Sequence, residues 1–339
     1  MVRTSIGDES ALRADSVWYL YAVAEFVFAT CLPGLEPAVK REVARTRPGL
    51  RFAYSRPGLI TFKSSSEISL ADPPGASFAR VWGRSIGAAR DPETARTLLA
   101  QAGVTATDCI HVFARDPEEA LAARWAALGT GTPREGERVG DVIVDAEDAW
   151  IGAHVHDRTR AALAGGGVKA ALPEGAPSRA YAKIEEAIAF ASLPVQAGQV
   201  AVEIGAAPGG AVMALARRGL SVTAVDPGEL APQVLALPGV SYLPIKVGAL
   251  RWEQLPDRVD WLLLDVNLAP QVALHEIARL MPKLRDTLRG AVLTLKLNDW
   301  SFVDELPKLV DRIHQLGFAE VRLRHLPSNR REICAIAIT

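Results

Sequence analysis

The sequence predicts an α/β protein in which a doubly wound, mostly parallel seven-stranded sheet follows a smaller α+β region. The first observation is the alternation of short apolar runs with helical segments from Ser178 onward, which is typical of parallel strands joined by crossover helices. These runs lack polar/apolar alternation, as strands buried on both faces do. The second observation is a glycine-rich turn after the first run, because glycines allow the backbone to approach a ligand closely.

Composition places the chain among globular proteins with nearly balanced charge. Of 339 residues, 49% are hydrophobic and 23% are charged, and the formal net charge is −1. A chain of this length forms roughly two or three domains. The small net charge gives no global signature of nucleic-acid binding, so any such surface must be local.

The cysteines and the most apolar early run indicate in which cellular compartment the protein is found. Cys31, Cys109 and Cys334 are scattered without zinc-site spacing, and they indicate a reducing compartment. The run 17–32 contains Glu25 and has no basic leader, so we interpret it as a buried strand rather than a signal peptide or membrane span. We therefore predict a cytoplasmic protein without a membrane partner.

The first half of the chain predicts two small α+β units after a loose segment. Residues 1–16 are polar and aperiodic, and the two units span 17–90 and 91–165. The expected elements are a strand from Val17, a helix starting at Pro33 or Pro37, strands near 51–54 and 59–62, an element over 77–87, helices over 92–101 and 117–128, and strands over 109–114, 141–144 and 150–155. Glycines at 165–167 begin a linker.

The larger domain, 166–339, holds the expected parallel sheet. Its expected strands are 200–204, 221–225, 241–246, 259–265, 291–296, 318–325 and 332–338, and its expected helices are 180–192, 211–218, 229–236, 270–287 and 301–316. We expect the last two strands to pair antiparallel. Ligands bind at the carboxyl ends of parallel strands, and the residues that fall there are Gly205, Asp226, Asp265 and Lys296.

The glycine-rich turn is a candidate cofactor site. It follows the first strand of the sheet and opens a helix whose first N–H groups would face a ligand. The turn lacks the Gly-Lys-Ser/Thr ending of an NTPase loop, and its glycines are spaced wrongly for a dinucleotide fingerprint. An ordinary strand–turn–helix is the alternative. Asp226 is placed to accept both hydroxyls of a ribose. The predicted cofactor-binding residues are Glu203, Gly205, Ala206, Ala207, Pro208, Gly209, Gly210, Asp226 and Asp265.

Four ionisable residues form the candidate catalytic set. They are Lys183, on the helix before the first strand; Asp265 and Lys296, which end apolar runs; and Glu332, which opens the last strand. Taken alone, each is better explained as ordinary surface or capping charge. Together, charges that close buried strands at one sheet edge point to a site.

The turn and the catalytic set resemble a known family. The form acidic-x-Gly-Ala-x-Pro-Gly-Gly over 203–210 resembles motif I of S-adenosylmethionine (SAM) methyltransferases, in particular the FtsJ-like branch that methylates RNA ribose. The catalytic set resembles the Lys-Asp-Lys-Glu tetrad of that branch. The segment Ser178–Lys183 matches its Ser-Arg-Ala-x-x-Lys, and Arg331-Glu332 matches its closing Arg-Glu.

More narrowly, the chain resembles the RlmM group, which methylates a cytidine ribose in 23S ribosomal RNA. The matching segments in the second half are the Pro-Ser-Arg lead-in at 177–179, Lys183-Ile184-Glu185-Glu186-Ala187 and Asp260-Trp261. In the first half, 31–36 and 78–82 look like the group's N-terminal signatures. The resemblance implies a ferredoxin-like domain over 17–90 and a THUMP-like RNA-binding domain over 91–165.

The resemblance also implies the chemistry: SAM-dependent methylation of an RNA ribose 2′-oxygen, with no metal required. Lys296 would be the general base, and Lys183 would lower the pKa of Lys296 and position the hydroxyl. Asp265 and Glu332 would orient the lysines and the ribose. Because an ordinary lysine has a pKa of ~10.4, burial or a like charge must lower the pKa of Lys296.

The sequence departs from the family at two places. Residues 244–248 lack the acidic residue that many relatives place near the adenine amino group, so the adenine contact stays open. Asp265-Val266-Asn267 also replaces the Asp-Met-Ala-Pro-Asn of the simplest members, which leaves recognition of the base open.

Basic residues near the catalytic set suggest a local RNA surface. They are Arg158, Arg160, Lys169, Arg179, Arg322, Arg324, His325, Arg330 and Arg331. We predict RNA binding, to large-subunit ribosomal RNA, by Arg179, Arg324, Arg330 and Arg331. Any single arginine is equally well explained as part of a solvated face. His154 and His156 are interpreted as structural.

Other functions are kept as alternatives. One is a noncatalytic RNA-binding ribosome-assembly factor that retains the SAM fold, and the intact set counts against it. Another is a methyltransferase of a non-RNA substrate, which the Lys-Asp-Lys-Glu set disfavours. A nicotinamide dehydrogenase ranks last, because no Tyr-x-x-x-Lys pair accompanies the glycine turn.

Overall fold

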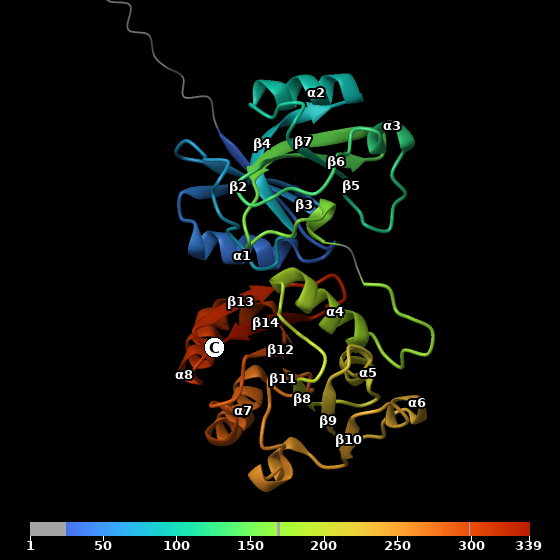
Figure 1. Ribbon diagram of the computed structural model, residues 1–339. Coiled ribbons are helices and arrows are strands. Elements are labelled where there is room, and N and C mark those ends of the chain that lie inside the picture. The colour runs from blue at the N-terminus through green and yellow to red at the C-terminus, as the bar shows by residue number, and fades with distance from the viewer. Residues whose placement is uncertain (1–24, 168–169, 298) are drawn as a thin grey trace, which may run out of the picture.

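The computed structural model describes residues 25–167, 170–297 and 299–339. The predicted loose segment 1–16 and the start of the predicted first strand lie outside these ranges. Two seven-stranded sheets, one from each half of the chain, form the two parts of the molecule (Figure 1). The predicted α/β class is confirmed. Within the described ranges, no helix has the length and apolarity needed to cross a membrane.

The N-terminal sheet has the order β2-β3-β1-β4-β7-β6-β5 and is antiparallel except for the pair β5–β6. Its strands are β1 (Phe26–Thr30), β2 (Leu50–Arg56), β3 (Leu59–Ser64), β4 (Val81–Ala89), β5 (Cys109–Ala114), β6 (Arg138–Asp145) and β7 (Asp148–Val155). The helices are α1 (Glu36–Thr46), α2 (Pro92–Gln101) and α3 (Ala123–Ala126). Strands from both predicted units join in this one sheet through β4–β7. The ferredoxin-like and THUMP-like assignments stay predictions.

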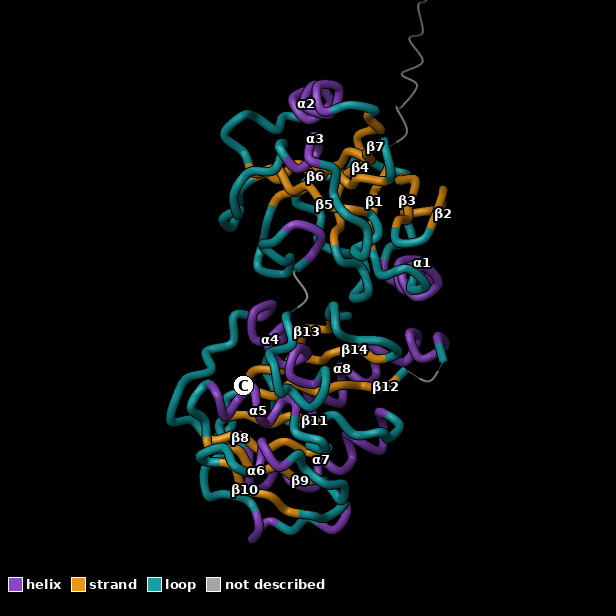
Figure 2. The backbone as a smooth tube through the Cα atoms, turned by 90° about the vertical axis from the view of Figure 1, so that its right-hand side faces the viewer, coloured by secondary structure: helices purple, strands orange, loops and turns teal. Residues whose placement is uncertain are grey.

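The C-terminal sheet has the order β10-β9-β8-β11-β12-β14-β13 (Figure 2). Its strands are β8 (Val200–Ile204), β9 (Ser221–Val225), β10 (Val240–Leu243), β11 (Trp261–Leu264), β12 (Gly290–Lys296), β13 (Glu320–Arg324) and β14 (Glu332–Ile338). The helices are α4 (Ala180–Ala191), α5 (Gly210–Arg217), α6 (Pro232–Leu235), α7 (Pro270–Leu284) and α8 (Leu306–Gln315). The expected doubly wound sheet and the final antiparallel pair β13–β14 are confirmed.

Three predicted helices were wrong in length. The helix over 117–128 shrinks to α3, because a turn capped by Asp116 and the burial of Trp125 in the core override the helix propensity of its alanines. The helix over 229–236 begins only at Pro232. The helix over 301–316 starts as a 3-10 segment, Trp300–Glu305, and turns α-helical where Pro307 occupies the first turn of α8.

The two halves meet through specific polar contacts. The backbone N–H of His325 donates to the Ser77 carbonyl at 3.0 Å, and the Arg324 guanidinium donates to the Arg80 carbonyl at 2.7 Å. The segment 164–167 also packs here, since a Cβ on Gly166 would lie 2.3 Å from the Arg80 carbonyl oxygen. In both views α4 and β13 lie at the end of the C-terminal half that faces the N-terminal half (Figures 1 and 2).

Candidate active site

The carboxyl edge of the C-terminal sheet gathers the predicted site residues. Gly205 follows β8, Asp226 follows β9, and Asp265 follows β11. Lys296 is the last residue of β12, which lies beside β11 in the parallel part of the sheet. The expectation that these four residues share one edge is confirmed.

Backbone crowding explains why glycines occupy the turn after β8. Gly205 has φ +87°, and a Cβ there would lie 2.4 Å from the Asp265 carbonyl oxygen. Gly209, at φ +107°, directly precedes α5. A Cβ on Gly210, the first residue of α5, would lie 2.3 Å from the Ser178 Oγ. The turn therefore packs tightly between the neighbouring strand and the segment before α4, with the N-terminus of α5 at its end.

Asp226 is held in place by the backbone. Its Oδ2 accepts a hydrogen bond from the Ala207 N–H at 3.1 Å, and its Oδ1 accepts one from the Gly228 N–H at 2.7 Å. A carboxylate has about four acceptor positions. Two backbone hydrogen bonds therefore fix the orientation of this carboxylate at the carboxyl end of β9.

Glu203 lies beneath the turn and is 1% exposed. Burial raises the pKa of its carboxyl well above the usual range, and the nearby charge of Asp265 raises it further. Its Oε2 has no hydrogen-bond partner among the described residues. A cavity of about 20 Å³, lined by Glu203, Lys183, Asp265 and Thr294, lies beside it. Burial and the charge of Asp265 thus both favour the neutral form of the Glu203 carboxyl.

The four residues of the candidate catalytic set form a closed ring of alternating charges. Lys183 Nζ donates to Asp265 Oδ2 at 2.9 Å and lies 2.5 Å from Glu332 Oε1. Lys296 Nζ donates to Asp265 Oδ1 and to Glu332 Oε2, both at 2.7 Å. The side chains are between 8% and 21% exposed. Each lysine therefore contacts both carboxylates, and a face of the ring reaches solvent.

Sheet register and one helix build this ring. β12 and β14 pair antiparallel with Lys296 directly opposite Glu332, which brings the two side chains together. Asp265 follows the adjacent strand β11, and Lys183 enters from α4. Asn329, which the sequence reasoning missed, extends its Nδ2 to within 3.4 Å of Glu332 Oε1. The polar pair Ser328-Asn329 directly before Arg330 was the available signal.

The expected lowering of the Lys296 pKa was wrong. Burial does lower the pKa of Lys296, but the carboxylates of Asp265 and Glu332 raise it by more, so the net shift is upward. Lys183 contacts the same two carboxylates as Lys296, but it is not among the causes of the shift in the Lys296 pKa. For Glu332, burial raises the pKa, yet hydrogen bonds from the two lysines lower it to about 2.

The lowered pKa of Glu332 predicts a pH dependence of stability. Its charged form stabilises the folded chain above the ordinary pKa of 4.5, and this contribution is lost as the pH falls toward about 2. We expect Glu332→Gln to lower the free energy of unfolding near neutral pH, and the difference from the natural chain to shrink below about pH 4.5. Urea unfolding at a series of pH values measures this. Glu118→Gln, at an exposed position, is the control and should show no such trend. A constant difference across the series would contradict the assignment.

The predicted RNA-binding arginines are placed differently from one another. Arg330 and Arg331 are exposed beside Glu332. Arg179 precedes α4 and donates to the Ser328 carbonyl at 3.3 Å. Arg324 is only 4% exposed and donates to the Arg80 carbonyl, a position that does not favour contact with RNA at the outer surface. Lys169 lies outside the described residues.

Comparisons with known proteins identify several proteins that are similar to this chain. No family model matches it. Ribosomal RNA large subunit methyltransferase M of Halorhodospira halophila is 37% identical over 172 residues, 49% of this chain and 48% of that protein. The protein of the same name from Methylococcus capsulatus is 33% identical over 236 residues, 66% of this chain and 64% of that protein.

The chain thus spans about half the length of the first of these relatives. Among solved structures, TrmN from Thermus thermophilus is 17% identical, with 93% of this chain and all of that chain covered at a TM-score of 0.35. Relatives at 32% to 37% identity over about half of the chain share the one name, ribosomal RNA large subunit methyltransferase M.

Proposed function

We propose that the chain transfers a methyl group from SAM to a ribose 2′-oxygen in RNA, most specifically a cytidine of 23S ribosomal RNA. The observation that carries the proposal is the closed Lys183–Asp265–Lys296–Glu332 ring at the carboxyl edge of the sheet. The relatives named ribosomal RNA large subunit methyltransferase M support it. The resemblance to FtsJ-like enzymes supports the ribose oxygen as acceptor.

The residues beside the ring suit SAM. Two backbone amides orient the Asp226 carboxylate toward ribose hydroxyls, and the turn 205–210 offers backbone N–H groups before α5. The raised pKa of Glu203 favours an uncharged carboxyl under the turn. When bound, SAM supplies an electrophilic methyl group on a sulfonium.

Lys296 is proposed as the general base, and the ring sets the conditions for that role. A ribose hydroxyl is a poor nucleophile, so its proton must be removed as the methyl is transferred. The two carboxylates stabilise the ammonium form of Lys296, so it begins protonated. An incoming hydroxyl that replaces one carboxylate contact would weaken that stabilisation and lower the pKa of Lys296. Lys296 would then release its own proton to solvent before its neutral amine accepts the proton of the hydroxyl. Lys183 keeps Asp265 and Glu332 paired meanwhile.

The N-terminal sheet is proposed to bind RNA around the reacting nucleotide. We retain the ferredoxin-like and THUMP-like assignments of 17–90 and 91–165 as part of this proposal, because such modules measure RNA shape rather than sequence. Arg179, Arg330 and Arg331 are proposed as phosphate contacts near the ring, since guanidinium groups pair well with phosphate. The cytoplasmic location stays a prediction.

The proposal is tested by incubating the purified chain with SAM labelled in its methyl group and ribosomal RNA that lacks the modification, both naked and in large-subunit particles. We expect label in RNA, at one nucleotide. Alkaline hydrolysis then locates it, because a 2′-O-methyl group protects the adjacent phosphodiester from cleavage. Label on a base nitrogen would overturn the ribose assignment. SAM binding without labelling of either substrate would favour the noncatalytic assembly factor.

A further inference from the structure

A second site lies where the two halves of the chain meet. A cavity of about 400 Å³, here called the junction pocket, is lined from the N-terminal half by Arg158, Arg160 and Leu163, and from the C-terminal half by Phe190, Arg322 and Arg324. Nothing in the ring chemistry uses it. Its lining combines guanidinium groups with an apolar wall, which suits a ligand with an anionic group and a flat body.

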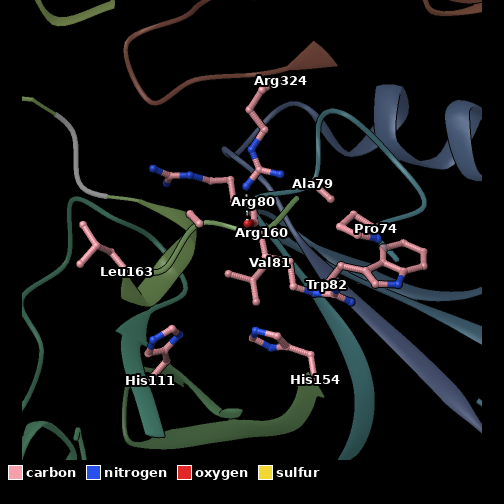
Figure 3. Close-up of a pocket in the computed structure, with 11 residues that line it drawn as sticks. Pro74, Ala79, Arg80, Val81, Trp82, His111, His154, Arg160, Leu163 and Arg324 are labelled. Atoms are coloured by element: carbon pink, nitrogen blue, oxygen red, sulfur yellow. Dashed lines mark hydrogen bonds between the residues drawn. The ribbon is translucent and has the colours of Figure 1, made fainter. Parts of the chain in front are cut away.

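Two buried arginines, Arg160 and Arg324, line both this pocket and an adjoining small cavity. In that small cavity Arg324 extends from β13 toward Arg80 and Arg160 (Figure 3). Arg324 and Arg160 are 4% and 7% exposed. The Nε atom of Arg160 is buried without a hydrogen-bond partner among the described residues. Buried donors of this kind are costly unless a ligand satisfies them.

The nearby carboxylates do not neutralise Arg324. Glu186 is the acidic lining residue, and the Ser328 N–H and Oγ and the Ala170 N–H already occupy its oxygens. Asp157 pairs with Arg160, and Glu320 pairs with Arg322 at 2.6 Å. Within the described residues, the hydrogen bond of Arg324 goes to a carbonyl, not to an acid.

Electrostatics and stacking both act on Arg324. Burial lowers the pKa of its guanidinium to about 10, and the positive charges of Arg80 and Arg160 add to that effect. The guanidinium carbon lies 4.9 Å from the centre of the Phe190 ring, which holds the plane in place. An anion entering the pocket would relieve the repulsion among the arginines.

Position along α4 relates the pocket to the ring. Lys183 of the ring and Phe190 of the pocket are on the same helix. A separation of seven residues corresponds to about 10 Å along a helix axis. A short stretch of single-stranded RNA can therefore place a ribose at the ring and a backbone phosphate in the pocket.

We propose that the junction pocket binds a backbone phosphate of the RNA substrate a short distance from the methylated nucleotide, with Arg324 as its central ligand and Arg158 at the rim. This inference rests on the proposed function in taking RNA as the substrate. It places the RNA contact predicted for Arg324 inside a pocket between the two halves rather than on the outer surface. Phe190 and Leu163 would contact the attached sugar or base.

The proposal is tested by measuring the affinity of the chain for a short RNA that contains the target nucleotide. The measurement is made without SAM and over a range of salt concentrations. We expect Arg324→Met and Arg158→Ala each to weaken binding roughly 10-fold or less and to reduce the slope of log affinity against log salt by about one. Arg324→Lys, which keeps the charge, should retain most of the slope. Arg96→Ala, on an exposed face of α2, is the matched control and should change neither.

The outcomes separate this inference from the proposed function. RNA binding that depends on Arg158 and Arg324, without methyl transfer, would support the pocket and overturn only the activity. Methyl transfer with unchanged affinity and salt slope in folded Arg324→Met and Arg158→Ala would overturn the pocket alone. If Arg324→Met does not fold, the RNA affinity and salt slope of Arg158→Ala and Arg324→Lys decide whether the pocket binds RNA. Thermal stabilisation by inorganic phosphate, with RNA affinity unchanged in the variants, would show a free-anion site and overturn the RNA assignment.

Discussion

Lys296→Ala should lower the rate of methyl transfer by about 10²- to 10⁴-fold, the usual contribution of a positioned general base. The substitution removes the amine proposed as the base, together with its hydrogen bonds to both Asp265 and Glu332. SAM affinity should change little, because the turn 205–210 and Asp226 lie on other strands of the sheet. Single-turnover transfer and calorimetric titration with SAM measure the two effects.

The variant Lys296→Arg distinguishes a role of Lys296 as general base from a role as a fixed positive charge. Arginine can still pair with the two carboxylates, but it stays protonated at any ordinary pH and cannot accept a proton. We expect Lys296→Arg to keep SAM affinity and lose transfer almost as completely as Lys296→Ala. If the arginine variant retains most of the rate, the base assignment is wrong and Lys296 acts only by its charge.

Gly205→Ala should weaken SAM binding at least roughly 10-fold, equivalent to about 1.4 kcal/mol, and also slow methyl transfer. The new Cβ would lie 2.4 Å from the Asp265 carbonyl oxygen and 2.6 Å from its carbonyl carbon. Either the turn or the end of β11 must move, and Asp265 also bears a ring carboxylate. Titration with SAM and urea unfolding of the variant measure the effect.

Gly198→Ala provides the matched control. Gly198 also has a positive φ, +83°, but a Cβ there meets no atom within 4 Å. It therefore bears only the backbone cost of the left-handed conformation, about 1–2 kcal/mol, without the collision. We expect normal SAM affinity in this variant. Equal SAM affinity in Gly205→Ala and Gly198→Ala would contradict the role given to the turn.

The strands around the site were predictable because each is an unbroken apolar run that ends in a charge or a glycine. β8, β9 and β14 have the predicted bounds, and Lys296 and Glu332 lie at the strand ends where the sequence placed them. Periodicity needs no knowledge of tertiary contacts when a strand is buried on both faces. For the same reason the candidate residues at the carboxyl edge of the sheet could be identified from the sequence alone.

Properties that depend on neighbours distant in sequence could not be predicted in this way. The direction of the Lys296 pKa shift depends on how many carboxylates contact its Nζ, which only the β12–β14 register and the position of β11 decide. Arg324 was predicted to be part of an RNA-binding surface, yet it contacts Arg80 and Phe190 from other elements. Likewise, the alanines near Trp125 favoured a longer helix than its burial allows.

The position of β14 between β12 and β13 has a consequence for the order of folding. β13 precedes β14 in the chain but cannot join the sheet until β14 has paired with β12. The edge of β12 therefore stays open until β14 has been synthesised, and an open apolar edge invites pairing with other chains. Since β14 also brings Glu332 to Lys296, closure of that edge and completion of the ring are one event. A nascent chain lacking β14 has neither a protected sheet nor a complete site.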